Sequence, residues 1–342
     1  MLIKKRILII GPIGEVGGVK THVDNLKRIL EPYASQVKVT QEAPVLKMIK
    51  EKLFYRPEII IYNLSVYRNK LLRDVLTRTI FSSKSCLQIV HLHGGRFSDI
   101  SFVKYFIWKK LLKFHFNRFK RIFCLTDEQF NFLLSCLDGS KQVKKIFNYV
   151  DLPHADYLDK KDEMLNLLYI GRLHPLKGIM TSIEAVRRIK DERIRFWIVG
   201  EGELENEIKK IDDHRVIFLG KKVGMEKNVI FSKAHVLLFP TSWPEGMPYS
   251  LLEASAFGLA LISTRVGSID RILFDGKNGF FVDAGDVSAL QNAIRTFIGD
   301  WGLVFRMGRE SRRICEEHFS LTKLQQIYDE LLKNINNENA ID

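Results

Sequence analysis

The sequence predicts an α/β protein of two successive doubly wound domains, each with a parallel sheet covered on both faces, which face a central cleft. Short apolar segments alternate with amphipathic helical segments along the chain, as is typical of parallel sheets. A polar, proline-containing stretch at 148–164 interrupts this alternation, as expected for an interdomain crossing. The 342 residues are long for one core and fit two domains.

The first predicted domain covers residues 1–155, in which residues 19–30 are a predicted helix. Its strands are predicted at residues 7–10, 59–62, 87–92 and 120–125. Thr126 is expected to cap a further helix, with Gln129 completing a capping box. The first apolar run is too short for a signal peptide, and no stretch reaches the ~18 apolar residues of a membrane span.

The second predicted domain covers residues 163–317, with helices between its strands. Its strands are predicted at residues 167–170, 196–199, 216–219, 236–239, 260–263 and 279–282. Residues 318–336 are predicted as a last amphipathic helix that packs back toward the first domain. Ligands of doubly wound domains bind at the carboxyl ends of the strands, so we expect the site where these ends face the cleft.

The net charge of +13 is concentrated in one part of the chain. Residues 1–160 contain 28 Lys and Arg against 14 Asp and Glu, a balance of +14, whereas the remaining residues have 25 against 26, a balance of −1. A one-sided basic surface suits nucleic acid, acidic lipid or acidic glycan, although a merely soluble basic protein has the same composition.

The densest basic region is the segment 100–126. Between Ile100 and Thr126 there are seven Lys or Arg and no Asp or Glu, interleaved with aromatic residues and leucines. This pattern is typical of a helix on an anionic membrane surface. The alternative is a helix with its apolar face in the core and its basic side chains in water. No known nucleic-acid motif accompanies the segment, so we expect a membrane partner and no nucleic acid.

Metal-ligand patterns are missing from the sequence. The four cysteines form no C-x-x-C pair, which favours buried, reduced thiols in a cytosolic protein. There is no D-x-D motif and no cluster of His and Asp with ligand spacing. We therefore expect no metal at the site, whose positive charge would come from basic side chains.

A glycine-rich loop follows the first predicted strand and ends in Gly17 and Gly18. Its spacing, G-x-x-G-x-x-G-G, differs from the G-x-G-x-x-G of dinucleotide sites, so NAD binding is poorly supported. A glycine-rich turn at a helix N-terminus suits an anion, because the backbone can approach the ligand closely. A tight turn between strand and helix explains the glycines equally well.

The segment 171–178 reads G-R-L-H-P-L-K-G directly after a predicted strand. Arg172 offers a planar fork to phosphate oxygens and Lys177 a point charge, and across a turn both can face one diphosphate. The helix that follows adds its N-terminal dipole. The alternative is a solvated basic loop, which the flanking glycines disfavour.

Two carboxylates lie eight residues apart in the segment 240–254. Glu245 lies in a loop rich in Pro and Gly, whereas Glu253 lies among apolar helix residues, where an enclosed carboxylate needs hydrogen-bond donors. A ribose diol would satisfy Glu253, and the N–H groups of Gly246 and Met247 could bind sugar hydroxyls beside Glu245. The alternative is a helix cap and a core salt bridge.

These motifs resemble those of the retaining GT-B glycosyltransferases of family four (glycosyl transferases group 1), which have two Rossmann-like domains. The resemblance covers about Leu165 to Glu317, through G-R-L-x-x-x-K-G, V-G-E-G at 199–202, F-L-G at 218–220 and the E-x7-E pair. The first half is similar more loosely, through G-G-V at 17–19 and H-L-H-G-G at 91–95. The family commonly has Asp where this chain has His235, and we expect no functional consequence.

The resemblance implies a role for each matching residue. Arg172 and Lys177 would neutralise the donor diphosphate, and Glu253 would hold the ribose. Glu245 and the N–H groups of Gly246 and Met247 would position the transferred sugar. The other residues implied in binding are Gly17 and Gly18 from the first domain, Gly200 in the donor site, and Lys222 and Val223 beside the nucleobase. His93 would lie beside the sugar, although a histidine there could equally be a core residue bonded to backbone.

The resemblance implies a retaining, metal-independent glycosyltransferase without a cofactor. It would move a hexose or N-acetylhexosamine from a UDP- or GDP-sugar to a lipid-linked or growing surface-polysaccharide acceptor, as in capsule or lipopolysaccharide assembly. We expect a cytoplasmic enzyme, peripheral to the inner face of the cell membrane. The alternatives are an epimerase, phosphorylase or dehydrogenase on the same architecture, or a non-catalytic member that binds anionic lipid or a partner.

Overall fold

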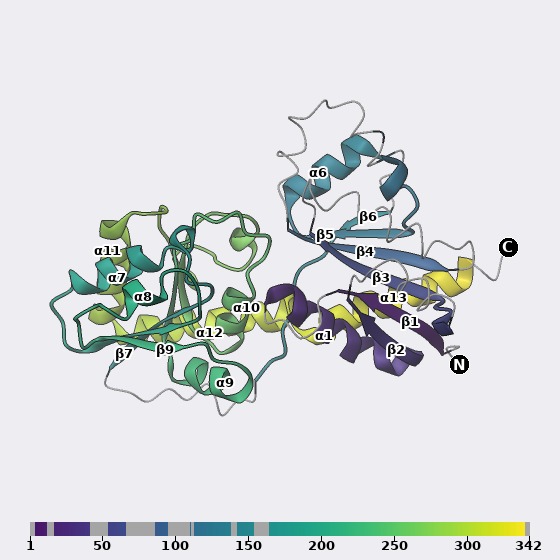
Figure 1. Ribbon diagram of the computed structural model, residues 1–342. Coiled ribbons are helices and arrows are strands. Elements are labelled where there is room, and N and C mark those ends of the chain that lie inside the picture. Colours follow the sequence, from purple (N-terminus) through teal and green to yellow (C-terminus); the bar gives the residue numbers. More distant parts are fainter. Residues whose placement is uncertain are drawn as a thin grey trace. The chain divides into compact units, whose positions relative to one another are not determined.

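Figure 1 shows the computed structural model, which describes residues 4–11, 17–41, 54–65, 86–94, 110, 113–137, 142–153 and 164–338. The chain divides into two compact units. Unit 1 comprises Met1–Tyr149 together with Leu321–Asp342, and unit 2 comprises Val150–Ser320. None of the described helices combines the length and the apolar character that crossing a membrane requires.

Unit 1 is built on a six-stranded parallel sheet in the order β2-β1-β3-β4-β5-β6. The strands are β1 Lys5–Ile10, β2 Ala34–Thr40, β3 Ile59–Ser65, β4 Leu87–Gly94, β5 Arg121–Cys124 and β6 Val143–Lys145. Alternate residues of β1 enter different buried clusters, with Ile7 and Ile9 in one and Leu8 and Ile10 in the other. An inner strand that is buried on both faces therefore reads as a continuous apolar run.

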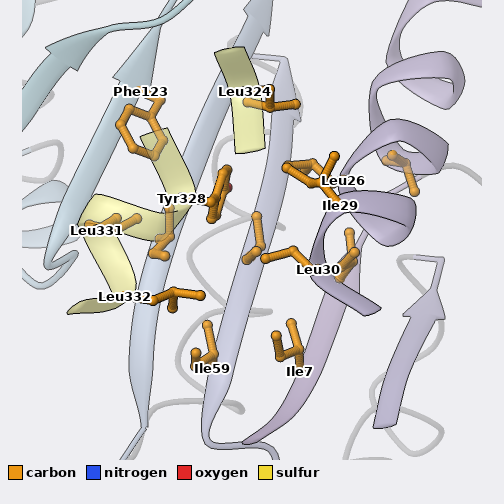
Figure 2. Close-up of a cluster of buried hydrophobic side chains, with 14 of the residues drawn as sticks. Ile7, Leu26, Ile29, Leu30, Ile59, Phe123, Leu324, Tyr328, Leu331 and Leu332 are labelled. Atoms are coloured by element: carbon orange, nitrogen blue, oxygen red, sulfur yellow. The ribbon is translucent and has the colours of Figure 1, made fainter. Parts of the chain in front are cut away.

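Helices pack on both faces of this sheet. They are α1 Gly18–Leu30, α6 Asp127–Cys136 and α13 Leu321–Glu338, with the 3-10 turn η1 Glu31–Tyr33. Leu26 and Ile29 of α1 pack with Tyr328 of α13 against the face that carries Ile7 (Figure 2). Leu133 of α6 belongs to the cluster on the opposite face. The last helix of the chain, which follows unit 2 in the sequence, thus completes a core of unit 1.

Unit 2 has a six-stranded parallel sheet in the order β12-β11-β10-β7-β8-β9. The strands are β7 Leu165–Ile170, β8 Ile194–Val199, β9 Val216–Gly220, β10 Val236–Phe239, β11 Ala260–Ser263 and β12 Gly279–Phe281. The helices are α7 Ile179–Arg187, α8 Glu205–Ile208, α9 Gly224–Lys233, α10 Tyr249–Ala256, α11 Val287–Gly299 and α12 Trp301–His318, with the 3-10 turns η3 Pro175–Lys177 and η4 Ile269–Arg271.

The strand order of unit 2 locates its topological switch point. From β7 the chain adds β8 and β9 on one side, and then returns to place β10 against the other side of β7. In doubly wound sheets a crevice for ligands lies at the carboxyl ends of the two strands where the order reverses. The loops that follow β7 and β10 are therefore the first place to look for a site.

The α/β class and the two parallel sheets agree with the sequence-based prediction. The predicted capping box is confirmed, since the Thr126 hydroxyl accepts a hydrogen bond from the Gln129 N–H at 3.1 Å and the Thr126 N–H donates to the Gln129 side chain at 3.4 Å. The prediction lacks β2 and β6, which are the edge strands of unit 1. β2 exposes Ser35 and Gln36, and such exposure interrupts the apolar run that marks an inner strand.

Candidate functional site

Two loops of unit 2 meet at the switch point of its sheet. The first follows β7 and contains η3, and the second follows β10 and leads into α10. The Leu176 carbonyl of the first loop accepts hydrogen bonds from the N–H groups of Ser242 at 2.8 Å and Trp243 at 3.0 Å. The Thr241 hydroxyl donates to the same oxygen at 3.2 Å. The two loops are therefore bonded to each other through one carbonyl group.

The ammonium group of Lys177 in the first loop forms an ion pair with the Glu245 carboxylate of the second. The two side chains are 15% and 12% exposed, so the pair is largely withdrawn from water. The Lys177 nitrogen lies 5.4 Å from the centre of the Trp243 ring and 5.8 Å from that of Phe239, as in cation–π contacts. The structure thus brings together two residues that the resemblance assigns to different parts of the ligand.

Arg172 differs from Lys177 because its side chain is exposed and forms no ion pair with any residue in the described ranges. Its carbonyl accepts a hydrogen bond from the Tyr169 hydroxyl at 2.8 Å, which anchors the start of the loop. Burial raises the pKa of Tyr169, and the nearby Glu245 charge raises it further, so this hydroxyl stays neutral. The Arg172 guanidinium is therefore open to an anionic ligand.

His174 braces the first loop. Its Nδ1 accepts a hydrogen bond from the Leu176 N–H at 3.1 Å, so in the neutral ring the proton is on Nε2, which lies 3.3 Å from the Glu203 carboxylate. The ring packs edge-on against Trp243 at a centroid distance of 4.9 Å. His174 therefore supports η3, and with it Lys177, against the second loop.

Two positions in this region must be glycine because the backbone of a neighbouring segment lies too close for a Cβ atom. Gly178 has φ +74°, and a Cβ there would lie 2.1 Å from the carbonyl oxygen of Pro240 in the second loop. A Cβ at Gly200, after β8, would lie 1.9 Å from the carbonyl oxygen of Gly171. Gly200 therefore has a packing reason to be glycine, in addition to the donor-site role that the resemblance implies.

Glu253 lies in the middle of α10, between the buried Leu252 and Ala254. Its Oε1 is 2.6 Å from Nζ of Lys227 on α9, and the two side chains are 19% and 25% exposed. Val223, the N-cap of α9, is 48% exposed, and Lys222 is 3.2 Å from Glu226. The start of α9, which the resemblance places near the nucleobase, is thus on the same helix as the partner of Glu253.

Gly246 and Met247 lie between Glu245 and the start of α10. The Gly246 carbonyl accepts a hydrogen bond from the Ser268 N–H at 2.9 Å, which ties the second loop to the loop after β11. Met247 is buried, and α10 begins after Pro248 without a side-chain cap. The first N–H groups of an uncapped helix suit hydroxyl or phosphate oxygens of a ligand.

Unit 1 places its predicted residues at the carboxyl ends of β1 and β4. Gly17 is the N-cap of α1 and Gly18 its first residue; both are exposed, and a Cβ at Gly17 would meet nothing described within 4 Å. Residues 12–16 of the same loop lie outside the described residues. His93 is partly exposed, and its Nε2 lies 2.9 Å from Oδ1 of Asn63. Desolvation lowers the pKa of His93 to about 3, so the ring is neutral.

His91 is a buried histidine two residues before His93. Its Nε2 lies 2.6 Å from the Tyr328 hydroxyl of α13, and its Nδ1 lies 3.2 Å from Nε2 of His22 on α1. Burial lowers the pKa values of His91 and His22 well below the usual range. The core-histidine explanation therefore applies to His91, whereas His93 as a residue is partly exposed.

Residues 165–300, which include both loops and both carboxylates, match the family model described as Glycosyl transferases group 1. Its relatives are glycosyltransferases too, and this chain is a glycosyltransferase. The glycosyltransferase is 25% identical to an uncharacterized glycosyltransferase of Methanocaldococcus jannaschii, over 98% of this chain and 100% of that one. It is also 25% identical to the capsular polysaccharide biosynthesis glycosyltransferase CapM of Staphylococcus aureus, over 84% of this chain and 81% of CapM.

Solved structures agree on the fold of this glycosyltransferase. Anabaena HepE in complex with UDP and glucose superposes with a TM-score of 0.74 at 17% identity, over 96% of this chain and 100% of that one. The sucrose-phosphate synthase of Thermosynechococcus elongatus superposes with a TM-score of 0.80 at 17% identity, over 98% and 100%. The GT-B fold, with two parallel sheets, is thus confirmed.

Much of the basic segment 100–126 lies outside the described residues of the glycosyltransferase. In the part that the structure describes, Phe116 and Phe119 are buried, whereas Phe114 is 52% exposed. The Arg118 guanidinium lies 4.2 Å from the centre of the Phe114 ring. This part therefore has both an inward-packed face and an exposed aromatic side chain with a cation on it.

The sequence-based site lacks several residues that the structure places beside it. Asn63 contacts His93, Lys227 contacts Glu253, and Trp243 contacts Lys177. Trp243 and His174 lie inside the two quoted motifs, so their positions in the sequence could have identified them as site residues. Asn63 and Lys227 lie outside every motif, on a strand and a helix, and only the tertiary structure reveals their partners.

Proposed function

We propose that this glycosyltransferase moves a hexose or N-acetylhexosamine from a UDP- or GDP-sugar to a lipid-linked or growing surface-polysaccharide acceptor. The donor part rests on the arrangement of Lys177, Glu245 and Glu253 around the switch point of unit 2. The names of relatives support the acceptor part. CapM is one, and another, 27% identical over 63% of this chain and 61% of its own length, is the Escherichia coli UDP-Gal:alpha-D-GlcNAc-diphosphoundecaprenol alpha-1,3-galactosyltransferase.

Arg172 and Lys177 would bind the donor diphosphate. Negative charge grows on the diphosphate as its bond to the sugar breaks, so two cations stabilise the transition state more than the ground state. The buried position of Lys177 favours this role, because water screens its charge little. The Lys177 ammonium would then lie between two anions, the diphosphate and the Glu245 carboxylate. Glu245 would accept a hydrogen bond from a hydroxyl group of the transferred sugar, beside the N–H groups of Gly246 and Met247.

Glu253 would bind the ribose through its second oxygen. Its Oε1 is bonded to Lys227, and no residue in the described ranges donates to Oε2, which leaves that oxygen for the ribose hydroxyls. Lys227 offsets the charge of a carboxylate between buried neighbours, where an unpaired charge is costly. The exposed Val223 and the neighbouring Lys222 would border the base.

Transfer would retain the anomeric configuration and need no divalent metal. Arg172, Lys177 and the N-terminus of α7 would supply the positive charge that a metal would otherwise bring to the diphosphate. A departing phosphate oxygen can take the proton of the acceptor hydroxyl, so the reaction needs no protein base. His93 would contact the sugar from unit 1, with Gly17 and Gly18 near the donor.

The enzyme would work at the cytoplasmic face of the cell membrane, where lipid-linked acceptors are accessible. The supporting observations are the excess of basic residues in segment 100–126 and the exposed Phe114 in its described part. Basic residues attract anionic lipid, while an aromatic ring enters the interface between water and lipid. Nucleic acid is not part of the proposal.

A donor screen combined with a binding measurement tests the proposal. Full-length enzyme is incubated with UDP-, GDP- or ADP-sugars and lipid-linked saccharides, with and without EDTA, and products are identified by mass spectrometry. Thermal unfolding is recorded with each nucleotide for the wild type, for Glu253→Gln and for the control Glu184→Gln, whose carboxylate forms an exposed ion pair with Arg188.

We expect one nucleotide to raise the Tm of the wild type and of the control but not that of Glu253→Gln, and we expect transfer to continue in EDTA. No stabilisation by any nucleotide would contradict the proposed donor site. Equal stabilisation of Glu253→Gln would show that Glu253 does not bind the ribose. Loss of transfer in EDTA would contradict metal independence.

A further inference from the structure

Arg265 follows β11 in the way that Arg172 follows β7, at the carboxyl end of a strand of unit 2. Both residues are exposed. Among the residues that the structure describes, none forms an ion pair or a side-chain hydrogen bond with the Arg265 guanidinium. Arg172 has a place in the proposed function as a ligand of the donor diphosphate. Arg265 has none, although it is a cation at the same edge of the sheet.

The loop that carries Arg265 is attached to the second loop of the site. The Thr264 hydroxyl donates a hydrogen bond to the Thr241 carbonyl at 2.6 Å. The Ser268 N–H donates to the Gly246 carbonyl at 2.9 Å. Arg265 lies between these two connections, so its backbone has a fixed position beside the loop that would bind the transferred sugar.

The side chain of Arg265 is held by an aromatic ring. The central carbon of its guanidinium lies 3.8 Å from the centre of the Phe281 ring on β12, as in a stacked cation–π contact. Asp275 binds the same strand, because its Oδ1 accepts a hydrogen bond from the Phe281 N–H at 2.9 Å, but it forms no ion pair with Arg265. A ring covers one face of a planar guanidinium and leaves the N–H groups in its plane uncovered. The cation is therefore oriented without being neutralised by any described residue.

The strand order places Arg265 beyond the transferred sugar. In the proposed function the base borders the segment after β9, the diphosphate lies at the loop after β7, and the sugar lies at Glu245 after β10. In the sheet, β11 follows β10 and β12 follows β11. Neighbouring strands are about 4.8 Å apart, so a guanidinium over β12 lies on the order of 10 Å past the end of β10. An anion at Arg265 would therefore be a different one from the donor diphosphate, which lies on the other side of the sugar.

We propose that Arg265 is a specificity-determining residue that binds an anionic group, a carboxylate or a phosphate, of the acceptor. The inference rests on the proposed function and deepens it, because it assigns a charge to the acceptor. A guanidinium binds such groups through paired N–H···O hydrogen bonds, whereas a lysine offers only a point charge. The anion can come from the diphosphate of a lipid-linked saccharide or from an acidic sugar of the glycan.

The competing explanation is that the stack of Arg265 on Phe281 only stabilises the edge strand β12. Under that explanation, replacing Arg265 lowers the Tm and leaves the preference between anionic and neutral acceptors unchanged. Under our proposal, the replacement weakens the binding of anionic acceptors alone. The basic segment 100–126 also attracts anions, so the comparison between variants is what separates the two explanations.

The experiment measures the binding of three farnesyl glycosides to the full-length enzyme by ligand-observed NMR, in the presence of UDP or GDP. Farnesyl-diphospho-N-acetylglucosamine has a diphosphate, farnesyl glucuronide has an acidic sugar, and farnesyl N-acetylglucosaminide has neither. The proteins are the wild type, Arg265→Gln, Arg265→Lys and the control Arg295→Gln. Arg295 is also an exposed arginine of unit 2 without an ion pair in the described ranges, but it lies on α11.

We expect the wild type and Arg295→Gln to bind one anionic glycoside about tenfold to a hundredfold more tightly than the neutral one, as a charged hydrogen bond provides. Arg265→Gln should lose this preference and Arg265→Lys should recover part of it, while the nucleotide raises the Tm of all four proteins equally. The glycoside that loses affinity identifies the source of the anion.

A wild type without any preference, or an unchanged preference in Arg265→Gln, would overturn the inference. If the nucleotide still stabilises the enzyme in that case, the proposed function stays intact. A wild type that no nucleotide stabilises would overturn both.

Discussion

Gly267 provides a direct test of how the second loop of unit 2 positions Glu245. It follows β11 and has φ +62°, a left-handed conformation that side chains disfavour. A Cβ at this position would lie 2.0 Å from the carbonyl oxygen of Glu245 and 2.8 Å from that of Gly246. Both obstacles are backbone atoms, so no rotation of a side chain relieves them. We therefore expect Gly267→Ala to displace the segment that holds the carboxylate.

Two costs add in Gly267→Ala. The left-handed backbone costs a residue with a side chain about 1–2 kcal/mol, and forcing extra volume into a packed position costs about 1–3 kcal/mol. Gly276 is the matched control, because it has φ +71° but its Cβ would meet nothing within 4 Å. Gly276→Ala should lose only the first amount, so the two variants should differ by about 1–3 kcal/mol in the free energy of unfolding.

Urea unfolding and calorimetric titration with the donor nucleotide sugar measure the two effects. We expect Gly267→Ala to bind the donor about tenfold more weakly. This loss corresponds to about 1.4 kcal/mol of binding free energy, the part of the strain that would reach the donor site. Gly276→Ala should bind like the wild type. If both variants lose the same stability and both keep wild-type affinity, the loop does not transmit the clash and our account of how Glu245 is positioned is wrong.

Two further predictions concern unit 1. Burial lowers the pKa values of His22, His91 and His93 below the usual 6.5, so the unfolded chain binds more protons and stability falls as the pH drops below that value. Urea unfolding should show a loss of about 4 kcal/mol between about pH 7.5 and about pH 5.5, and equal stability at both would contradict a neutral cluster. Full-length protein should sediment with vesicles that contain anionic lipid, at ~1 kcal/mol per basic residue near the surface. Salt should release it and Phe114→Ala should weaken it; absent or salt-insensitive binding would contradict the membrane proposal.

Strand positions in this chain were predictable where both faces of a strand are buried. Ile7 to Ile10 alternate between two cores, so every residue is apolar and the strand is visible in the sequence. The edge strands β2 and β6 were not predictable in this way. The three residues of β6 include the exposed Lys144 and Lys145, and a segment of this kind has no apolar pattern to detect.

The contacts within the site were less predictable than the loops that carry them. Lys177 and Glu245 are 68 residues apart, and Asn63 and His93 are 30 apart. Each loop could be located from its glycines and charges, but the pairing depends on the order of strands in the sheet. No local pattern encodes that β10 returns to the side of β7, and this return is what places the two loops together.

A motif glycine can be identified correctly from the sequence although the structural reason for it is not visible there. Gly178 ends the segment G-R-L-H-P-L-K-G, and a Cβ there would overlap the Pro240 carbonyl of the second loop. The same two loops share the Leu176 carbonyl, to which Trp243 donates from the second loop. Lys177 stands between Gly178 and Leu176, so its direction is set by contacts on both sides. The motif therefore connects the two loops through Leu176 and Gly178. These contacts hold Lys177, the side chain that would bind the diphosphate, in place.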